Sequence, residues 1–303
     1  MQDTLTKSLR DSFPDAEILE NEPMSRHTTF RTGGAASVFM TVSDTSALQN
    51  AVHFLTEHDV PYFIIGNGSN ILVGDKGFDG VIVHPAGSFC RVTVDGNMIE
   101  AGAGALLSEV SAAAVRSSLT GLEFASGIPG TVGGAVRMNA GAYDGEMKQG
   151  IRNVSLRRPD GTVIVSEGVD MGFGYRTSIV CSEKLTVMSA LMQLKPGDAK
   201  DIRSRIDEFG SRRREKQPLE YPSAGSTFKR PEGYFAGKLI SDAGLKGYSV
   251  GGAQVSEKHA GFVINKGGAT ATDIKKLIED VQAKVYETSG VKLEREVIFV
   301  GNF

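Results

Sequence analysis

The stretch Ser126-Gly127-Ile128-Pro129-Gly130-Thr131-Val132-Gly133-Gly134-Ala135 decides what kind of fold this chain adopts. It carries four glycines within eight residues, and its neighbours are apolar, unlike the polar residues of a flexible linker. We therefore expect a buried segment whose backbone closely approaches something else. That partner is either the pyrophosphate of a cofactor, bound by backbone amides, or another sheet packed against the glycines.

A second glycine-rich stretch, Gly66-Asn67-Gly68-Ser69-Asn70, directly follows the apolar run Pro61–Ile65, which predicts a buried strand. Glycine lets successive backbone N–H groups form a concave nest for phosphate, and Asn and Ser add side-chain donors. The pattern is not the Rossmann GxGxxG, and no helix clearly begins from it. A phosphate nest and a tight turn between strands are both compatible with it.

Composition limits the possible functions. The 303 residues include 37 glycines, which is roughly 12% against a usual ~7%, and this excess is typical of a nucleotide or cofactor binder. A net charge of -3 and a pI near 6.0 give no electrostatic footprint for nucleic acid. The length predicts two domains. No GxxxxGK[ST], HExxH or GxSxG motif is present, which disfavours a P-loop nucleotidase, a zinc peptidase and an α/β-hydrolase.

Targeting and metal-binding signals are missing as well. The first thirty residues are too charged for a signal peptide, and no apolar run reaches the ~18 residues of a membrane span. Cys90 and Cys181 stand alone, which predicts small buried side chains rather than a disulfide or a metal site. We expect a cytoplasmic protein without a metal.

The periodicity of apolar residues predicts an α+β fold, because helices and strands alternate irregularly. Strands are expected at 37–42, 61–65, 71–73, 81–84 and 185–194, with hairpins at 92–101 and 154–166 and a closing strand at 293–300. Helices are expected at 45–58, 107–117, 199–213 and 272–289. The helix at 199–213 should bury Ile202, Ile206 and Phe209. The helix at 272–289 has an apolar stripe made of Ile274, Leu277, Ile278, Val281 and Val285.

Two further features lie in the second half of the chain. The run Arg212–Lys216 either complements the C-terminus of a helix or forms a basic rim for a diphosphate substrate. In Ala224-Gly225-Ser226-Thr227-Phe228-Lys229, Ser226 occupies a glycine-flanked turn. No His or Lys lies at the spacing that would make Ser226 a nucleophile, so a proton donor is its possible role.

Together these segments resemble the UDP-N-acetylenolpyruvoylglucosamine reductases (the UDP-N-acetylmuramate dehydrogenases), flavoproteins of the vanillyl-alcohol-oxidase-like superfamily. The resemblance extends from about Asn21 to the C-terminus. Besides the two glycine-rich stretches and the Ser226 turn, it rests on Thr28–Gly34, Asn139–Tyr143, Tyr175-Arg176, Ala236–Ile240, Lys258–Ala260 and Glu296-Val297. The short spacing before Arg176 is similar to the subclass that lacks an extra tyrosine-bearing loop. Arg295 stands where many members have Pro.

The resemblance implies a particular domain organisation. Residues 1–28 would form an N-terminal helix and a leading segment. Residues 29–195 would form a PCMH-type FAD-binding domain of two α+β subdomains, and residues 196–303 a C-terminal α+β substrate-binding domain.

The resemblance also implies the site residues. Arg176, Ser226 and Glu296 would be catalytic. Noncovalent FAD would contact Gly66, Asn67, Gly68, Ser69, Asn70, Ser126, Gly127, Gly130, Thr131, Gly133, Gly134 and Asn139. The UDP-sugar substrate would contact Tyr175, Lys216, Lys229, Lys238 and His259.

The implied reaction is the reduction of UDP-N-acetyl-3-O-enolpyruvylglucosamine to UDP-N-acetylmuramate, with NADPH as hydride donor. Hydride would reach the terminal methylene carbon of the alkene by way of FAD, and a proton would reach the adjacent carbon. This step belongs to peptidoglycan synthesis, and hence to cell wall biogenesis, cell shape, cell division and the cell cycle. Two alternatives stay open: another FAD-dependent oxidase or dehydrogenase of the superfamily, and a non-catalytic nucleotide-binding protein.

Overall fold

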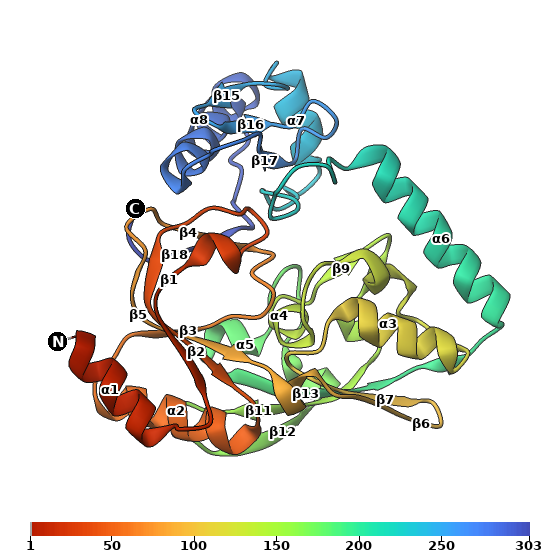
Figure 1. Ribbon diagram of the computed structural model, residues 1–303. Coiled ribbons are helices and arrows are strands. Elements are labelled where there is room, and N and C mark those ends of the chain that lie inside the picture. Colours follow the sequence, from red (N-terminus) through yellow and green to blue (C-terminus); the bar gives the residue numbers. More distant parts are fainter. Residues whose placement is uncertain (1) are drawn as a thin grey trace. The chain divides into compact units, whose positions relative to one another are not determined.

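The computed structural model describes residues 2–303 (Figure 1). The chain forms two compact units that interleave along the sequence. The first unit comprises the chain through Ile18, Phe39–Asn67 and Ile82–Arg212, and the second comprises Leu19–Val38, Gly68–Val81 and Arg213–Phe303. The contiguous domains expected at 29–195 and 196–303 stay a prediction.

The largest sheet of the first unit is antiparallel, with strand order β12-β11-β13-β7-β6 (Figure 1). Its strands are β6 (Val92–Asp95), β7 (Met98–Gly102), β11 (Ile151–Arg157), β12 (Val163–Glu167) and β13 (Thr186–Gln193). The pairs β6–β7 and β11–β12 confirm both predicted hairpins. Their turns place Gly96 and Gly161 at φ +56° and +93°, a region that glycine adopts without a steric penalty.

Two helices cover this sheet. The helix α3 (Leu107–Arg116) buries Leu107, Val110 and Ala114, and α4 (Val132–Arg137) packs on β13. The segment from Ser126 to Thr131 therefore leads directly into α4, which fixes the glycine-rich stretch against the core of the first unit.

A four-stranded sheet has the order β1-β2-β5-β3, and α2 (Thr45–Glu57) follows its second strand. Its strands are β1 (Glu17–Pro23), β2 (Ala35–Val42), β3 (Tyr62–Ile64) and β5 (Phe78–Pro85). The Asp44 side chain caps α2 by accepting from the amide of Ala47 at 2.8 Å. The strand predicted at 61–65 is present, but the prediction that it is buried was wrong, because β3 is an edge strand and Tyr62 is 36% exposed.

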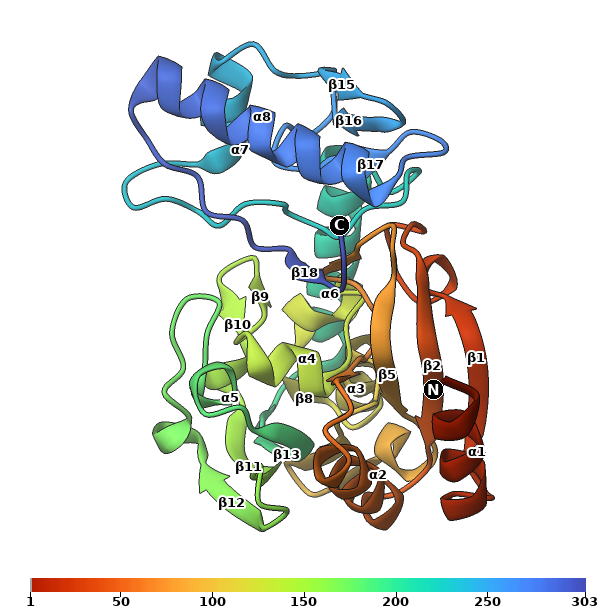
Figure 2. The same cartoon turned by 90° about the vertical axis from the view of Figure 1, so that its left-hand side faces the viewer.

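The second unit is built around a small antiparallel sheet, β15-β16-β17, with α8 along it (Figure 2). Its elements are β4 (Ile71–Val73), α7 (Ala236–Asp242), β15 (Ser249–Val250), β16 (Ala253–Val255), β17 (Val263–Asn265), α8 (Ala271–Ser289) and β18 (Ile298–Val300). The predicted apolar stripe of α8 is buried in the core with Phe30 and Leu72. A capping box at Thr270 begins α8, and Gly290 at φ +70° ends it.

Other elements are shorter. They are α1 (Gln2–Ser12), β8 (Leu119–Thr120), β9 (Gly141–Ala142), β10 (Gly145–Glu146), α5 (Ile179–Ser182), β14 (Lys195–Pro196) and α6 (Ala199–Lys216). The mixture of helices with mainly antiparallel strands confirms the predicted α+β class. No helix among the described residues combines the length and apolarity of a membrane span.

Three expectations need correction. In α6, Ile202 is buried but Ile206 and Phe209 are only half-buried, because most of this long helix faces solvent. The closing strand covers only 298–300, since residue 295 forms an isolated bridge elsewhere. Cys90 and Cys181 are exposed free thiols, because they lie in a short 3-10 turn and a one-turn helix at the surface.

Candidate active site

In the first unit, the glycine-rich loop after β3 is tied to the glycine-rich segment before α4. The Asn67 side chain donates from Nδ2 to the carbonyl of Pro129 at 2.7 Å. A Cβ at position 66 would come within 2.3 Å of the Thr131 Oγ1 atom. The absence of a side chain at Gly66 therefore allows the two segments to approach each other.

These joined segments leave backbone donors without partners. Carbonyls of the 130–131 region are engaged, since Leu107 N donates to Gly130 O at 3.0 Å. By contrast, within residues 2–303 the amides of Asn67, Gly130 and Thr131 donate to no acceptor. Unpaired amides from two adjoining segments suit the anionic phosphates of a dinucleotide, so the residues present fit FAD.

The two glycines at the start of α4 differ in their surroundings. A Cβ at Gly133 would lie 3.1 Å from both the Cβ and the carbonyl oxygen of Ala103. At Gly134 the only neighbour of an added Cβ would be Thr131 Oγ1, at 3.8 Å, and the residue is exposed. Gly133 thus serves packing inside the protein, whereas Gly134 leaves open space in front of the backbone.

The other end of the 66–70 loop belongs to the second unit. Gly68 has φ +59°, and a Cβ there would lie 1.9 Å from the carbonyl oxygen of His27. Asn70 donates from Nδ2 to the carbonyl of Glu296 at 3.2 Å and accepts from the amide of Ile298 at 3.0 Å. Gly68 and Asn70 thus have structural contacts of their own, and Asn70 lies beside a predicted catalytic residue.

Arg176 projects from a tight turn in the first unit. Residues 174 and 177 pair across this turn, with Gly174 N donating to Thr177 O at 3.1 Å. Arg176 itself has φ +57°, a left-handed conformation that costs an ordinary side chain roughly 1–2 kcal/mol. Its Cζ atom lies 5.1 Å from the ring centroid of Tyr175, which is 53% exposed. Strain of this size at an arginine is typical of a functional turn.

Ser226 and Glu296 lie close together in the second unit, although seventy residues separate them in sequence. Phe228 and Arg295 form an antiparallel bridge, in which Glu296 N donates to Thr227 O and Lys229 N to Glu294 O, both at 2.8 Å. Ser226 is exposed, and its hydroxyl has no hydrogen-bond partner within residues 2–303. Glu296 is half-buried. This short ladder joins two of the three predicted catalytic residues.

The predicted substrate-binding cations differ in pairing. Lys229 forms an ion pair with Glu294 at 3.2 Å, and Lys238 with Asp242 at 2.8 Å. Lys216 is exposed at the end of α6 and has no ion-pair partner among the described residues. Exposed pairs of this kind contribute little and exchange partners easily, so all three lysines stay available to an anionic ligand.

His259 is held in one tautomer. Its Nδ1 accepts from the amide of Gly261 at 3.1 Å, which places the ring proton on Nε2. Burial holds the pKa of this imidazole below its usual value, and the nearby cation Lys246 lowers it further. At neutral pH, His259 is therefore an uncharged donor.

Sequence reasoning missed an aromatic pair beside the predicted cation Lys238. Tyr234 and Phe235 are 48% and 60% exposed just before α7, and the Arg230 guanidinium lies 4.0 Å from the Phe235 ring centroid. The signal in the sequence was the presence of two adjacent aromatic residues in a turn. A turn does not itself require aromatic residues, so exposed rings there indicate a contact surface.

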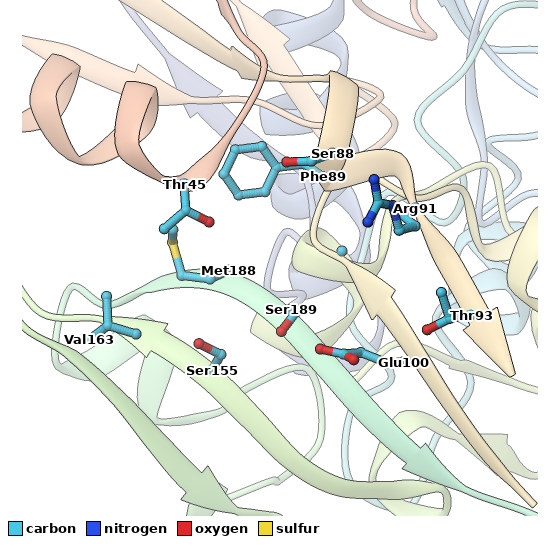
Figure 3. A pocket seen from close by; sticks show the side chains of 11 residues that line it. Thr45, Ser88, Phe89, Arg91, Thr93, Glu100, Ser155, Val163, Met188 and Ser189 are labelled. Carbon is cyan, nitrogen blue, oxygen red and sulfur yellow. The ribbon is translucent and has the colours of Figure 1, made fainter. Parts of the chain in front are cut away.

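A cavity of about 320 Å³ in the first unit is lined by none of the predicted site residues (Figure 3). Among its lining residues are Arg91, Glu100, Ser155, Met188 and Ser189. Within the described part of the chain, no three His, Cys, Asp or Glu side chains form a metal-binding group.

Comparison with known families and proteins gives consistent results. The model of the FAD binding domain matches residues 36–167, and the model of the UDP-N-acetylenolpyruvoylglucosamine reductase C-terminal domain matches residues 217–300. A UDP-N-acetylenolpyruvoylglucosamine reductase of Agathobacter rectalis is 49% identical, with 100% of both chains covered. One from Caldanaerobacter subterraneus subsp. tengcongensis is 47% identical over 99% of each. The solved reductase of Thermus caldophilus superposes with a TM-score of 0.81 at 36% identity, covering 94% of this chain and 98% of that one.

Proposed function

The chain belongs to the UDP-N-acetylenolpyruvoylglucosamine reductase family, and we propose from this that it converts UDP-N-acetyl-3-O-enolpyruvylglucosamine to UDP-N-acetylmuramate, with NADPH as reductant. The observation that carries this function is identity of nearly one half with such reductases along the whole chain. The chain is thus an FAD-dependent oxidoreductase of peptidoglycan precursor synthesis, and we place it in the cytoplasm, where NADPH is available.

The glycine-rich segments of the first unit are proposed to hold the FAD. The unpaired amides of Asn67, Gly130 and Thr131 support this assignment, and Gly134 leaves room for close approach. When bound there, FAD would supply the hydride-transfer chemistry between NADPH and the enolpyruvyl group. Binding is proposed to be noncovalent, since no His or Cys occurs in either stretch. Acid precipitation should leave the yellow colour in the supernatant, and colour in the pellet would contradict this.

Arg176 is proposed to bind the carboxylate of the substrate. Hydride addition to the terminal carbon places negative charge on the adjacent carbon and on that carboxylate, and lowering the energy of this charge is the main task of the protein. A guanidinium stays protonated at every working pH and offers paired donors to a carboxylate. The strained turn presents Arg176 beside an exposed Tyr175, which supports a role in contact with ligand.

Ser226 is proposed to deliver the proton to the α-carbon, with Glu296 next to it. The Ser226 hydroxyl is exposed and has no partner inside the described chain, so it is available to a ligand. Glu296 is fixed by its backbone, whose amide donates to Thr227 and whose carbonyl accepts from Asn70. Its carboxyl group assists only if it is protonated or hydrogen-bonded through an intermediary, because a bare carboxylate repels the developing charge.

The side chains that we propose to contact the sugar nucleotide are those of Lys216, Lys229, Lys238, His259 and Tyr175. The lysines offer charge to the diphosphate, and the neutral His259 offers a donor from Nε2.

A two-stage experiment tests the function. The purified yellow protein is reduced anaerobically with NADPH, and the enolpyruvyl sugar nucleotide is then added. Rapid reoxidation by this compound, with formation of UDP-N-acetylmuramate, is the expected result. Reoxidation by oxygen but not by the sugar nucleotide would instead indicate an oxidase, and failure of NADPH to reduce the flavin would indicate a binding protein.

A further inference from the structure

Asn139 is buried and uses its side chain entirely inside the protein. It is 1% exposed, and its backbone has φ +44°. From Nδ2 it donates to Glu146 Oε2 at 2.7 Å and to Gly174 O at 3.1 Å, while Oδ1 accepts from Lys148 N at 3.0 Å. Both amide protons therefore have acceptors within the first unit, which gives this residue a task other than the flavin contact expected from the sequence.

The hydrogen bonds of Asn139 lead to two structures that support Arg176. The first is the turn, because Gly174 is its opening residue and Arg176 stands two residues later. The second is the strand of Gly141, whose carbonyl accepts from the guanidinium Nη2 at 3.4 Å. Gly141 pairs with Glu146 across the hairpin β9–β10. One amide group thus connects the strand opposite Gly141 with the base of the Arg176 turn.

We propose that Asn139 is the positioning residue of Arg176: by bridging Glu146 and Gly174, it holds the strained turn and the hairpin at the separation that aims the guanidinium. This inference rests on the proposed role of Arg176. In this positioning role, Asn139 touches neither the substrate nor the cofactor. The left-handed φ of Arg176 costs energy that the surrounding structure must offset, and the bonds of Asn139 to Glu146 and Gly174 contribute to this.

Asparagine suits this position for two reasons. It tolerates the left-handed backbone better than other residues with side chains. It also supplies two donors to two oxygen acceptors, whereas aspartate would place an acceptor against the Glu146 carboxylate and the Gly174 carbonyl. The exchange Asn139→Asp keeps size and shape but reverses the polarity of this bridge.

The test measures reoxidation of the reduced enzyme by the enolpyruvyl sugar nucleotide, as a function of pH. For Asn139→Asp we expect a loss of about 10²-fold at pH 8, the usual effect of a 1 Å displacement of a catalytic group. The loss should shrink as the pH falls, because protonation of the introduced carboxyl group restores a donor; the Lys148 ammonium, 2.7 Å from Glu146 Oε1, moves this protonation to lower pH. The wild type should show no such gain. A variant with wild-type rates at every pH would overturn the proposal.

Two further variants distinguish a positioning role of Asn139 from a role in stability alone. In Asn139→Asp with Glu146→Gln, the glutamine amide can donate to the new carboxylate, which restores the link to the hairpin but not the one to Gly174. We expect its thermal stability to recover and its reoxidation to stay slow, whereas full recovery of the rate would show that Asn139 only stabilises the hairpin. Glu146→Gln alone should reoxidise within about threefold of wild type.

Asn139→Gly covers the case in which the aspartate variant fails to fold, since glycine accepts φ +44° without strain. The reoxidation rate of Asn139→Gly should be lower than that of wild type by the same factor at all pH values, and a normal rate would overturn the proposal. Arg176→Ala is measured in the same series. If Arg176→Ala reoxidises normally, the proposed function of Arg176 fails. If only Arg176→Ala is slow and the Asn139 variants are normal, the positioning inference alone fails.

Discussion

The backbone amide of Glu296 donates to the carbonyl of Thr227 at 2.8 Å, which fixes Glu296 beside the residue that follows Ser226. The same ladder includes Lys229 N to Glu294 O at 2.8 Å. Backbone atoms thus hold this pair of proposed catalytic residues together. Side-chain substitutions at Ser226 or Glu296 should therefore alter chemistry while leaving the local structure in place.

Ser226→Ala should affect only one half of the catalytic cycle. Reduction by NADPH requires no proton at the substrate carbon, so its rate should stay near normal. Reoxidation by the enolpyruvyl substrate requires that proton and should slow by ~10² or more. Because the hydroxyl has no partner within the described residues, the melting temperature should not change. Stopped-flow traces of both half-reactions check this, with Ser226→Cys as a variant that retains a donor. Equal slowing of both halves would make Ser226 structural.

Arg295→Pro should be tolerated. The ladder with residues 227–229 uses the amide of Glu296 and the carbonyl of Glu294, and neither the amide nor the carbonyl of Arg295 takes part. The loss is the contact of the Arg295 guanidinium with the Phe299 ring, 4.0 Å from its centroid, worth roughly 0.5–1 kcal/mol. Urea unfolding should show a change of about that size or less, with wild-type turnover. A loss of turnover would mean that Arg295 itself contacts the substrate.

Local patterns in the sequence predicted most elements. The stripe of α8 and the hairpin turns at Gly96 and Gly161 depend on neighbouring residues, and such signals can be read from one chain. The incomplete burial of Ile206 and Phe209 could not be predicted, because it depends on which surface the rest of the chain leaves for α6 to cover.

For the site, motif resemblance identified residues but not their contacts. Glycine at position 68 is required by the His27 carbonyl, forty-one residues earlier, as well as by any phosphate. Likewise, the partners of Asn139 lie up to thirty-five residues away. Such pairings arise from tertiary packing, which local propensity does not encode.

Gly134→Ala should separate flavin binding from folding. The added methyl meets only Thr131 Oγ1 at 3.8 Å, and alanine in a helix is favoured over glycine by up to about 1 kcal/mol. We therefore expect apo-protein at least as stable as wild type but with a lower affinity for FAD, measured by flavin fluorescence on titration. Unchanged affinity would remove Gly134 from the proposed site.

Gly68→Val would not give equivalent information about the flavin. Its Cβ would collide with the carbonyl of His27, and valine at φ +59° is strained, so this variant should lose stability before flavin binding can be assessed. A melting temperature close to that of wild type would contradict this expectation.

Arg176→Gly and Arg176→Ala should differ in stability but not in activity. Both remove the guanidinium, so both should weaken substrate affinity and slow reoxidation. Only glycine relieves the left-handed backbone at φ +57°, which should make Arg176→Gly more stable by about 1 kcal/mol. Thermal unfolding of the two proteins side by side measures this difference, and equal stabilities would show that the turn carries no strain.

His259 should make stability depend on pH on the acid side of neutrality. Its folded-state pKa is lowered by burial, so the folded protein binds fewer protons than the unfolded chain once the pH falls below the ordinary value near 6.5. Stability from this group is therefore fully present above that pH and declines as the pH falls toward the folded-state pKa, by at most about 1.4 kcal/mol per pH unit for one proton. The same protonation removes the acceptor that Nδ1 offers to the amide of Gly261.

His259→Gln can keep an acceptor for that amide without titrating, and the other histidines contribute equally to both proteins. Urea unfolding between pH 5 and 8 should show a steeper acid-side loss for wild type than for His259→Gln, and parallel curves would mean that the imidazole titrates alike in both states.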